Sequence, residues 1–184
     1  MENGDRLPPQ DSLPWIRTAR LTLRPMTLDD APDIFAYSAD PAVLRYTTGT
    51  TPAQPEDTRV WLEGALADPN THMWAILLSD SPAVIGAIEF GIPLPGNGSI
   101  HYALGRSYWG AGLMTEAVEA VCRWAMDALP SLEDITTGVV AENVASSRVL
   151  EKCGFEYIGS IVEQWDRQPR PVELRMYRRQ RSRS

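Results

Sequence analysis

The stretch Tyr108-Trp-Gly-Ala-Gly-Leu-Met-Thr-Glu-Ala117 decides the fold of this chain, because it joins a strand pattern to a helix pattern through a glycine turn. A short apolar stretch, Ile100 to Leu104, precedes it, and an amphipathic stretch, Leu113 to Leu129, follows it. A strand that enters a helix in this way points several backbone N–H groups at one place, where an anion such as a pyrophosphate can bind. Two glycines also let a ligand approach the main chain closely. The turn therefore predicts a phosphorylated cofactor.

Taken alone, the turn leaves a second interpretation open, namely a glycine turn with no ligand. Two familiar phosphate loops are excluded. The stretch contains no Gly-Lys-Ser/Thr, which the nucleoside-triphosphate loop requires, and its glycines lack the spacing of dinucleotide-binding folds. The choice between the two interpretations depends on residues further along the chain.

Length, composition and charge restrict the class of protein. A chain of 184 residues with 43% hydrophobic and 22% charged residues has the size and composition of one soluble globular domain. No apolar run approaches the ~20 residues of a membrane span, and the first residues do not resemble a signal peptide. The formal charge of −7 argues against nucleic acid as a partner and mildly favours a cationic substrate. Two cysteines and two histidines, without metal-ligand spacing, predict a cytoplasmic protein with reduced thiols and no metal.

The chain reads as a single domain with short ends. Residues 1–14, which carry three prolines among polar groups, predict a flexible leader, and residues 179–184 predict a solvated basic tail. Residues 15–178 predict one domain in the order β-α-α-β-β-β-α-β-α-β-β, and hence a mixed α/β fold. The expected strands are 21–24, 73–78, 84–90, 100–104, 135–140, 155–164 and 171–177, and the expected helices are 27–38, 56–67, 113–129 and 143–153.

A second constellation, Val140-Ala-Glu-Asn-Val-Ala-Ser-Ser-Arg-Val-Leu-Glu-Lys-Cys-Gly-Phe155, lies about thirty residues beyond the turn. It predicts a strand end, a polar turn, a capped helix and a glycine stop. Asn143 and Ser146 fall at the cap and in the first helical turn. They can hydrogen-bond a ligand held at that helix mouth, or they can simply cap backbone N–H groups.

The two motifs together, in this order and spacing, resemble the GNAT superfamily of N-acetyltransferases, and most closely its RimJ/RimL type. The opening Thr18-Ala-Arg-Leu-Thr-Leu-Arg-Pro25 and the ending at Met176-Tyr177 are also similar to that type, so the resemblance covers roughly residues 17–178. It implies the acyl-CoA N-acyltransferase fold, a central mixed β-sheet flanked by helices. It also implies an enzyme that acetylates ribosomal-protein N-termini or other amines.

The resemblance assigns a binding site for acetyl-CoA. The glycine turn would bind the pyrophosphate through main-chain N–H groups, and the preceding strand would pair with the pantetheine and leave the thioester in a splayed gap. Asn143 and Ser146 would contact the pantetheine and the sulfur, and Arg106 could hold phosphates or be a surface charge. The residues implied for the coenzyme are Ala103, Leu104, Gly105, Arg106, Trp109, Gly110, Ala111, Gly112, Leu113, Met114, Thr115, Asn143 and Ser146.

The sequence departs from the general pattern of the superfamily at three positions. Trp109 stands where Gln or Arg is usual, and Met114 where a small residue is usual. Both changes recur in the RimJ/RimL branch. The tyrosine that many members use as a general acid falls on Leu150, so that role has no occupant in the motif.

Acetylation of an amine requires a neutral amine, a polarised carbonyl and a proton for the leaving thiolate. A lysine amine is neutral in only about one molecule in several thousand at pH 7, whereas an α-amine costs about 1 kcal/mol to deprotonate. Glu89 is the best candidate for a base, His101 could share or replace it, and Ser146 is the candidate proton donor. Each residue also has a non-catalytic interpretation. Glu89 can be an exposed strand carboxylate, His101 a structural histidine and Ser146 a capping serine. A strand N–H near Leu104 would polarise the carbonyl.

The sequence thus predicts an acetyl-CoA-dependent N-acetyltransferase in which a primary amine attacks directly. The alternative from another class is a non-catalytic acyl-CoA-binding module that regulates a partner, suggested by Leu150. The expected partners are acetyl-CoA and an amine acceptor, without nucleic acid or membrane. The acceptor, the length of the acyl group and the oligomeric state stay open, with a homodimer among the alternatives.

Overall fold

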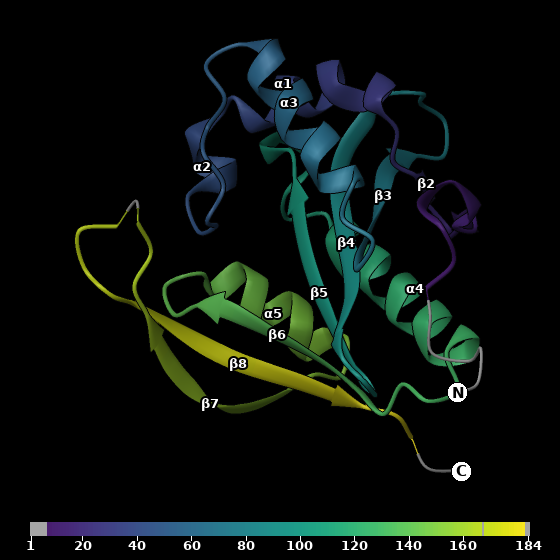
Figure 1. Ribbon diagram of the computed structural model, residues 1–184, viewed down its shortest axis with the longest axis vertical. Coiled ribbons are helices and arrows are strands. Elements are labelled where there is room, and N and C mark those ends of the chain that lie inside the picture. Colours follow the sequence, from purple (N-terminus) through teal and green to yellow (C-terminus); the bar gives the residue numbers. More distant parts are fainter. Residues whose placement is uncertain (1–6, 167, 183–184) are drawn as a thin grey trace.

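A computed structural model describes residues 7–166 and 168–182, which form one eight-stranded sheet with helices on both faces (Figure 1). The strand order is β1-β2-β3-β4-β5-β6-β8-β7. The strands are β1 (Ile16–Arg17), β2 (Leu21–Pro25), β3 (Thr71–Leu78), β4 (Val84–Leu94), β5 (Asn97–Leu104), β6 (Asp134–Val140), β7 (Glu156–Glu163) and β8 (Val172–Gln180). The α-helices are α1 (Ala31–Ser38), α2 (Pro41–Leu44), α3 (Pro55–Leu66), α4 (Leu113–Ala128) and α5 (Val144–Lys152).

The predicted mixed α/β fold is confirmed, with two small additions. All predicted strands and helices are present, and among the strands and α-helices of the described residues only the two-residue β1 and the four-residue α2 were not predicted. The pattern at Thr27 forms a capping box, in which Asp30 binds back to the backbone of Thr27. Within the described residues, no helix is both long and apolar enough to cross a membrane.

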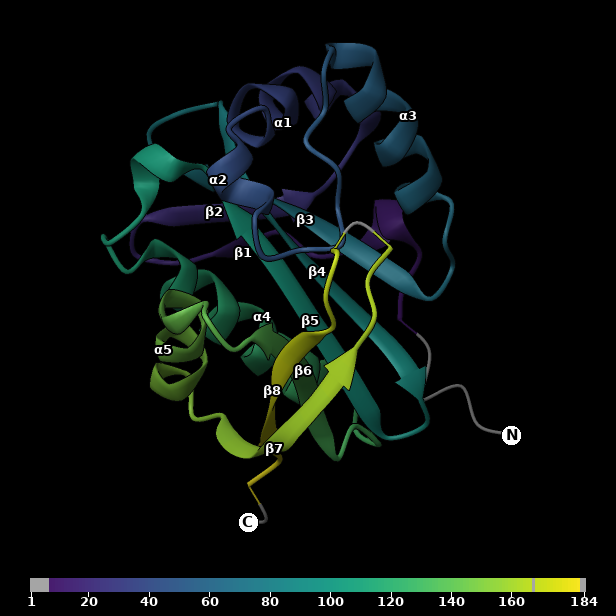
Figure 2. The ribbon, with the colours of Figure 1, turned by 90° about the vertical axis from the view of Figure 1, so that its left-hand side faces the viewer.

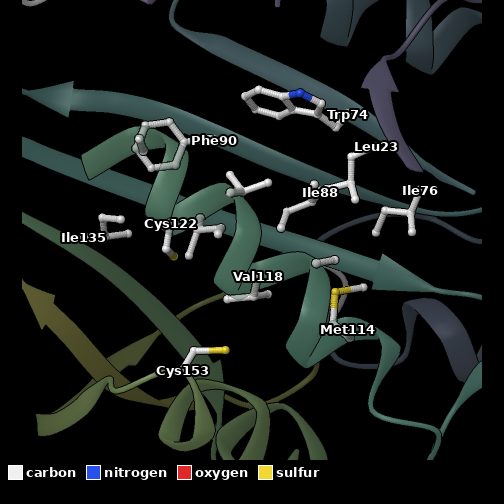
Figure 3. Packing of buried hydrophobic residues seen from close by; sticks show 14 of the residues in the cluster. Leu23, Trp74, Ile76, Ile88, Phe90, Met114, Val118, Cys122, Ile135 and Cys153 are labelled. Carbon is white, nitrogen blue, oxygen red and sulfur yellow. The ribbon is translucent and has the colours of Figure 1, made fainter. Parts of the chain in front are cut away.

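Strands β2 to β5 form an antiparallel half-sheet with helices packed on both faces. Helices α1 and α3 cover one face and α4 covers the other (Figures 1 and 2). Trp74, Ile88 and Phe90 are fully buried against α4, as Figure 3 shows. The predicted apolar stripe of α4 is buried as expected, at Met114, Ala117, Val118, Val121, Ala125 and Leu129.

The two halves of the sheet meet at β5 and β6, which pair in parallel over three residues only. Asn97, Gly98 and Ser99 are opposite Asp134, Ile135 and Thr136. Beyond this point β6 continues against β8, and β8 pairs with β7. The second half of the sheet therefore separates from β5, and α5 lies beside this second half (Figure 1).

The described part of the predicted leader is packed against the sheet, which corrects the expectation of a flexible segment there. Leu7 and Leu13 are buried. The amide of Gln10 hydrogen-bonds the backbone of Met26 and Met73, as a neighbouring strand would. Proline-rich sequence suggested mobility, but two leucines and one well-placed amide stabilise a fixed position. Residues 1–6 lie outside the described part of the chain.

The predicted basic tail is also corrected, because its first residues are part of β8. Arg179 forms a hydrogen-bonded ion pair with Glu119 of α4, at 2.6 Å. Arg181 donates to the carbonyls of Leu129 and Leu132, just after the end of α4. A guanidinium has five N–H donors, so Arg181 can satisfy carbonyls near the end of α4 that lack a helical partner. Residues 183 and 184 lie outside the described part.

Candidate functional site

The separation of β5 from β6 begins at a cluster of polar side chains. Asn97 hydrogen-bonds both Asp134 and Thr136 where the strands are still paired. At the next position, the buried hydroxyl of Thr137 donates to the carbonyl of Ile100 at 2.7 Å. This side-chain bond satisfies the first β5 carbonyl that β6 no longer reaches with its backbone. The gap therefore opens at Ile100 and Thr137.

The backbone of β5 beyond Ile100 presents an open edge to the gap. In an antiparallel pair, opposed residues alternate between pairs that exchange hydrogen bonds and pairs that do not. Gly105 N donates to Ile85 O at 2.8 Å, so Ala103 and His101 also bond to β4. The N–H and C=O groups of Tyr102 and Leu104 therefore point away from β4, toward the gap. The Leu104 carbonyl accepts from the indole of Trp109, so a ligand with amide groups can pair with the N–H of Leu104 and with the N–H and C=O of Tyr102, as an added strand would.

The glycine turn follows directly and holds two left-handed residues. Gly110 and Gly112 have φ of +77° and +76°, a region that glycine enters without strain. Gly112 is the N-cap of α4, so the N–H groups of the first helical turn have no acceptor inside the helix. The indole of Trp109 donates to Leu104 O at 2.7 Å, which ties the turn to the end of β5.

Hydrogen bonds and an ion pair from Thr18 and Arg20 hold the glycine turn in place. These contacts were not predicted from the sequence. Arg20 donates to Ala111 O at 2.8 Å and pairs with Glu116 at 2.7 Å. Glu116 also accepts from Thr18 and from the backbone of Arg20. Burial raises the pKa of Glu116, but these hydrogen bonds outweigh it and keep the pKa below its ordinary value. The carboxylate thus stays ionised and holds the turn in place.

The mouth of α5 brings a third group of side chains to the gap. Asn143 is the N-cap of α5, and its side chain accepts from Ser146 N at 3.2 Å. Ser146 Oγ lies 2.8 Å from the hydroxyl of Tyr102 on β5. Burial raises the pKa of Tyr102 far above its ordinary value, so the phenol is neutral. Leu150 is fully buried and faces the core. Sequence reasoning missed Tyr102 because only tertiary structure places it next to Ser146.

The two candidate bases lie on the other face of the sheet. Glu89 and His101 are directly opposed in the β4–β5 register. Glu89 points away from Ile88 and Phe90, which are buried against α4. Glu89 is partly buried and His101 is exposed, on the face that carries α1 and α3. Arg106 reaches Asp40 beside α2, at 3.5 Å.

The comparisons with known proteins agree with this geometry. A family model of the acetyltransferase (GNAT) domain matches residues 20–156. The chain belongs to the GNAT acetyltransferases. The match includes β5, the glycine turn, the mouth of α5 and Glu89, so the whole candidate site lies inside the family domain.

Relatives of this GNAT acetyltransferase share most of their length with it. The uncharacterized N-acetyltransferase p20 of Bacillus licheniformis is 30% identical over 165 residues, 87% of this chain and 92% of the relative. A GNAT-family acetyltransferase from Bacillus anthracis has a TM-score of 0.81 at 21% identity, covering 91% of this chain and 98% of its own. Microcin C7 self-immunity acetyltransferase MccE, in complex with acetyl-CoA and AMP, has a TM-score of 0.77 at 17% identity, covering 89% and 93%. At these identities the two structures support the fold alone.

Two of the hollows on the described surface of the acetyltransferase have known lining residues. One, of about 320 Å³, lies between the loop at Thr47 and Thr48 and the β7–β8 connection, with Trp165 and Asp166 on its wall. The other, of about 790 Å³, lies between residues 14–19 and the outer side of α4, and no residue of β5 or β6 lines it. Among the described residues, no group of three or more His, Cys, Asp or Glu side chains could hold a metal ion.

Proposed function

We propose that this acetyltransferase transfers the acetyl group of acetyl-CoA to a primary amine, and that it is of the RimJ/RimL type. The acceptor is a peptide or protein N-terminus or a small amine. The observation that carries the proposal is the open edge of β5 at Tyr102 and Leu104, which leads straight into the glycine turn. An edge that can pair with amides beside a cradle of N–H groups suits a ligand with an amide chain and a pyrophosphate.

The residues present fit acetyl-CoA, which supplies the activated acetyl group as a thioester. Open space surrounds the Cα of Gly110, where a Cβ would meet no atom within 4 Å, so the turn can lie directly against a phosphate. The N–H groups of residues 110–115 would hold the pyrophosphate, and Asn143 and Ser146 would lie at the pantetheine end. Trp109 and Met114, which distinguish the RimJ/RimL branch in sequence, belong to this turn. MccE, a relative of the same fold, is known with acetyl-CoA bound.

The catalytic roles follow from which side of the gap each residue occupies. Leu104 N–H points into the gap and would polarise the thioester carbonyl. Glu89, with His101 opposite it, would receive the proton of the amine through water on the acceptor side. Ser146, on the α5 side, would donate a hydrogen bond to the sulfur. Attack is direct, so no covalent enzyme intermediate is needed.

The acceptor reaches the gap from the face of Glu89 in this proposal, past the hollow at Thr47 and Trp165. The net charge of −7 favours cationic acceptors. Cytoplasmic location and the absence of a nucleic-acid or membrane partner belong to the same proposal, and Cys122 and Cys153 are buried thiols. A homodimer stays a prediction. The exposed apolar side chains of edge strand β7, Tyr157, Ile158, Ile161 and Val162, are the place to seek its interface.

The test is release of free thiol from acetyl-CoA with a panel of peptide N-termini, polyamines and aminoglycosides. Gly112→Val should raise KM for acetyl-CoA at least about tenfold, because a β-branched residue is strained at positive φ. Gly64→Ala in α3 is the matched control, since a Cβ there meets nothing and should leave KM unchanged. Tight binding of acetyl-CoA without turnover of any amine would favour the non-catalytic module instead.

A further inference from the structure

We infer that Tyr102 is a positioning residue, which turns the hydroxyl proton of Ser146 toward the thioester sulfur in the gap. The inference rests on the proposed function and concerns a residue outside both sequence motifs. Tyr102 comes from β5 and Ser146 from α5, so the pair bridges the two halves of the sheet where they separate. Leu150 is buried in the core, and the phenol at this site comes from the sheet instead of from the helix.

Either oxygen of the Tyr102–Ser146 pair can donate, and we take Tyr102 as the donor on the basis of the distances. Tyr102 Oη lies 2.8 Å from Ser146 Oγ and 3.3 Å from the carbonyl of Ser146. That carbonyl faces the N–H four residues along α5, as every carbonyl in the first helical turn does. The phenol is partly buried and neutral, so it has one proton to donate, and the shorter contact is with Ser146 Oγ.

A serine hydroxyl that accepts from Tyr102 has its own proton free to point elsewhere. Ser146 N is bound to the side chain of Asn143, which fixes the first turn of α5 on the other side. In this inference the free Ser146 proton points into the gap, toward the sulfur. Without Tyr102, the hydroxyl can rotate and donate to a neighbouring acceptor, and the donor at the sulfur is lost.

The chemical effect falls on the step in which the thiol leaves. As nitrogen attacks the carbonyl carbon, the C–S bond breaks and its electron pair stays on sulfur as a thiolate. A hydroxyl proton directed at sulfur stabilises this charge only as it develops, so it lowers the barrier without tightening substrate binding. Tyr102 itself transfers no proton, and the proton lost by the amine balances the thiolate through solvent.

The experiment compares Tyr102→Phe, Ser146→Ala and the double variant in the full chain, with kcat and KM for acetyl-CoA measured separately. Tyr102→Phe should lower kcat about tenfold with KM changed less than about twofold, as expected for an interaction made only in the transition state. The double variant should be no slower than Ser146→Ala, because both changes remove the same donor. Tyr157→Phe is the matched control, since it removes an exposed phenol 3.0 Å from Ser160 Oγ on β7 and should change neither constant.

Three results would overturn the inference. They are an unchanged kcat in Tyr102→Phe, effects of the two variants that multiply, or a rise in KM alone. A titration with CoA shows whether Tyr102→Phe is folded. If it is not, full kcat in Ser146→Ala overturns the inference by itself. Failure of the proposed function is distinguishable, because then the wild-type chain turns over no amine.

Discussion

The strand positions of Glu89 and His101 determine which face of the sheet carries the candidate bases. The two residues are opposed across β4 and β5, on the face away from α4. Residues of one strand alternate between faces, so the acid–base candidates and the Tyr102–Ser146 pair lie on opposite sides of the same sheet. The amine can therefore lose its proton on one side of the gap while the thiol leaves on the other.

Glu89→Gln tests this role through its dependence on pH. At pH 7 most of the amine is protonated, and removal of the base should lower kcat/KM about tenfold to a hundredfold. At pH 9 an α-amine is already neutral, so the deficit should shrink. The measurement is a pH profile of kcat/KM with a peptide N-terminus as acceptor. His101→Gln, made in parallel, shows whether the histidine shares the role. A deficit that is equal at both pH values would assign Glu89 to binding or structure.

Residue-level prediction succeeded for local geometry and failed for contacts between residues that are distant in the sequence. The cap at Asn143 and the outward direction of Glu89 follow from local pattern. Tyr102 meets Ser146 across 44 positions, and Arg20 meets Ala111 across 91. No spacing rule connects such pairs, because the packing of the whole sheet brings them together.

At the scale of elements, the site depends on β6 turning away from β5. Continued pairing would fill the edge at Tyr102 and Leu104 with backbone hydrogen bonds. The buried hydroxyl of Thr137 replaces the first missing bond, to Ile100 O. We therefore expect this one side chain to determine the position at which the two strands separate.

Thr137→Val should destabilise the fold and weaken the coenzyme site together. A buried carbonyl left without its donor costs about 1–3 kcal/mol, visible as a lower urea midpoint. KM for acetyl-CoA should rise about threefold to tenfold, since the β5 edge is no longer fixed where the gap opens. Thr137→Ser keeps the hydroxyl and is expected to restore most of both quantities. A stable Thr137→Val variant with wild-type KM would show that the side chain does not set this position.

The order and types of the elements could be predicted because their hydrophobic periods are clear. The stripe of α4 repeats at helical spacing, and the strands alternate or are continuously apolar. The lengths of strand pairing could not be predicted. The sequence predicted a strand at 100–104, whereas β5 begins at Asn97, and the three residues that pair with β6 lie before the predicted strand.

At the scale of the whole molecule, residues 7–14 act as an additional layer at the edge of the sheet. They cover β3 through Leu13 and Gln10, and Pro14 accepts from the indole of Trp74. His72, on the same strand, is buried, and its Nδ1 has no hydrogen-bond partner. Burial lowers the pKa of His72 below its ordinary value of 6.5, more than the backbone of Pro8 and the charge of Asp68 raise it.

Stability should therefore fall in mildly acidic solution. In the unfolded chain His72 takes up a proton as the pH falls through about 6.5, whereas in the folded chain it resists protonation. The stability that neutral His72 contributes is complete above that pH and is lost as the pH falls toward the folded pKa. Urea midpoints between pH 7.5 and 5 measure the slope. His72→Gln should flatten it and His101→Gln, at an exposed site, should not. Equal slopes in all three proteins would contradict the prediction.

The link from Thr18 and Arg20 to Glu116 and Ala111 has a consequence for the order of folding. These contacts join residues 91 to 98 positions apart, while β3, β4 and β5 are joined by short hairpins. Contacts between distant positions carry a larger loop-closure cost and form late. We therefore expect the hairpins to form early. The glycine turn should reach its final shape only when Thr18 and Arg20 make their contacts with Glu116 and Ala111. The ability to bind coenzyme would then appear last during refolding, and could serve as the reporter of its final step.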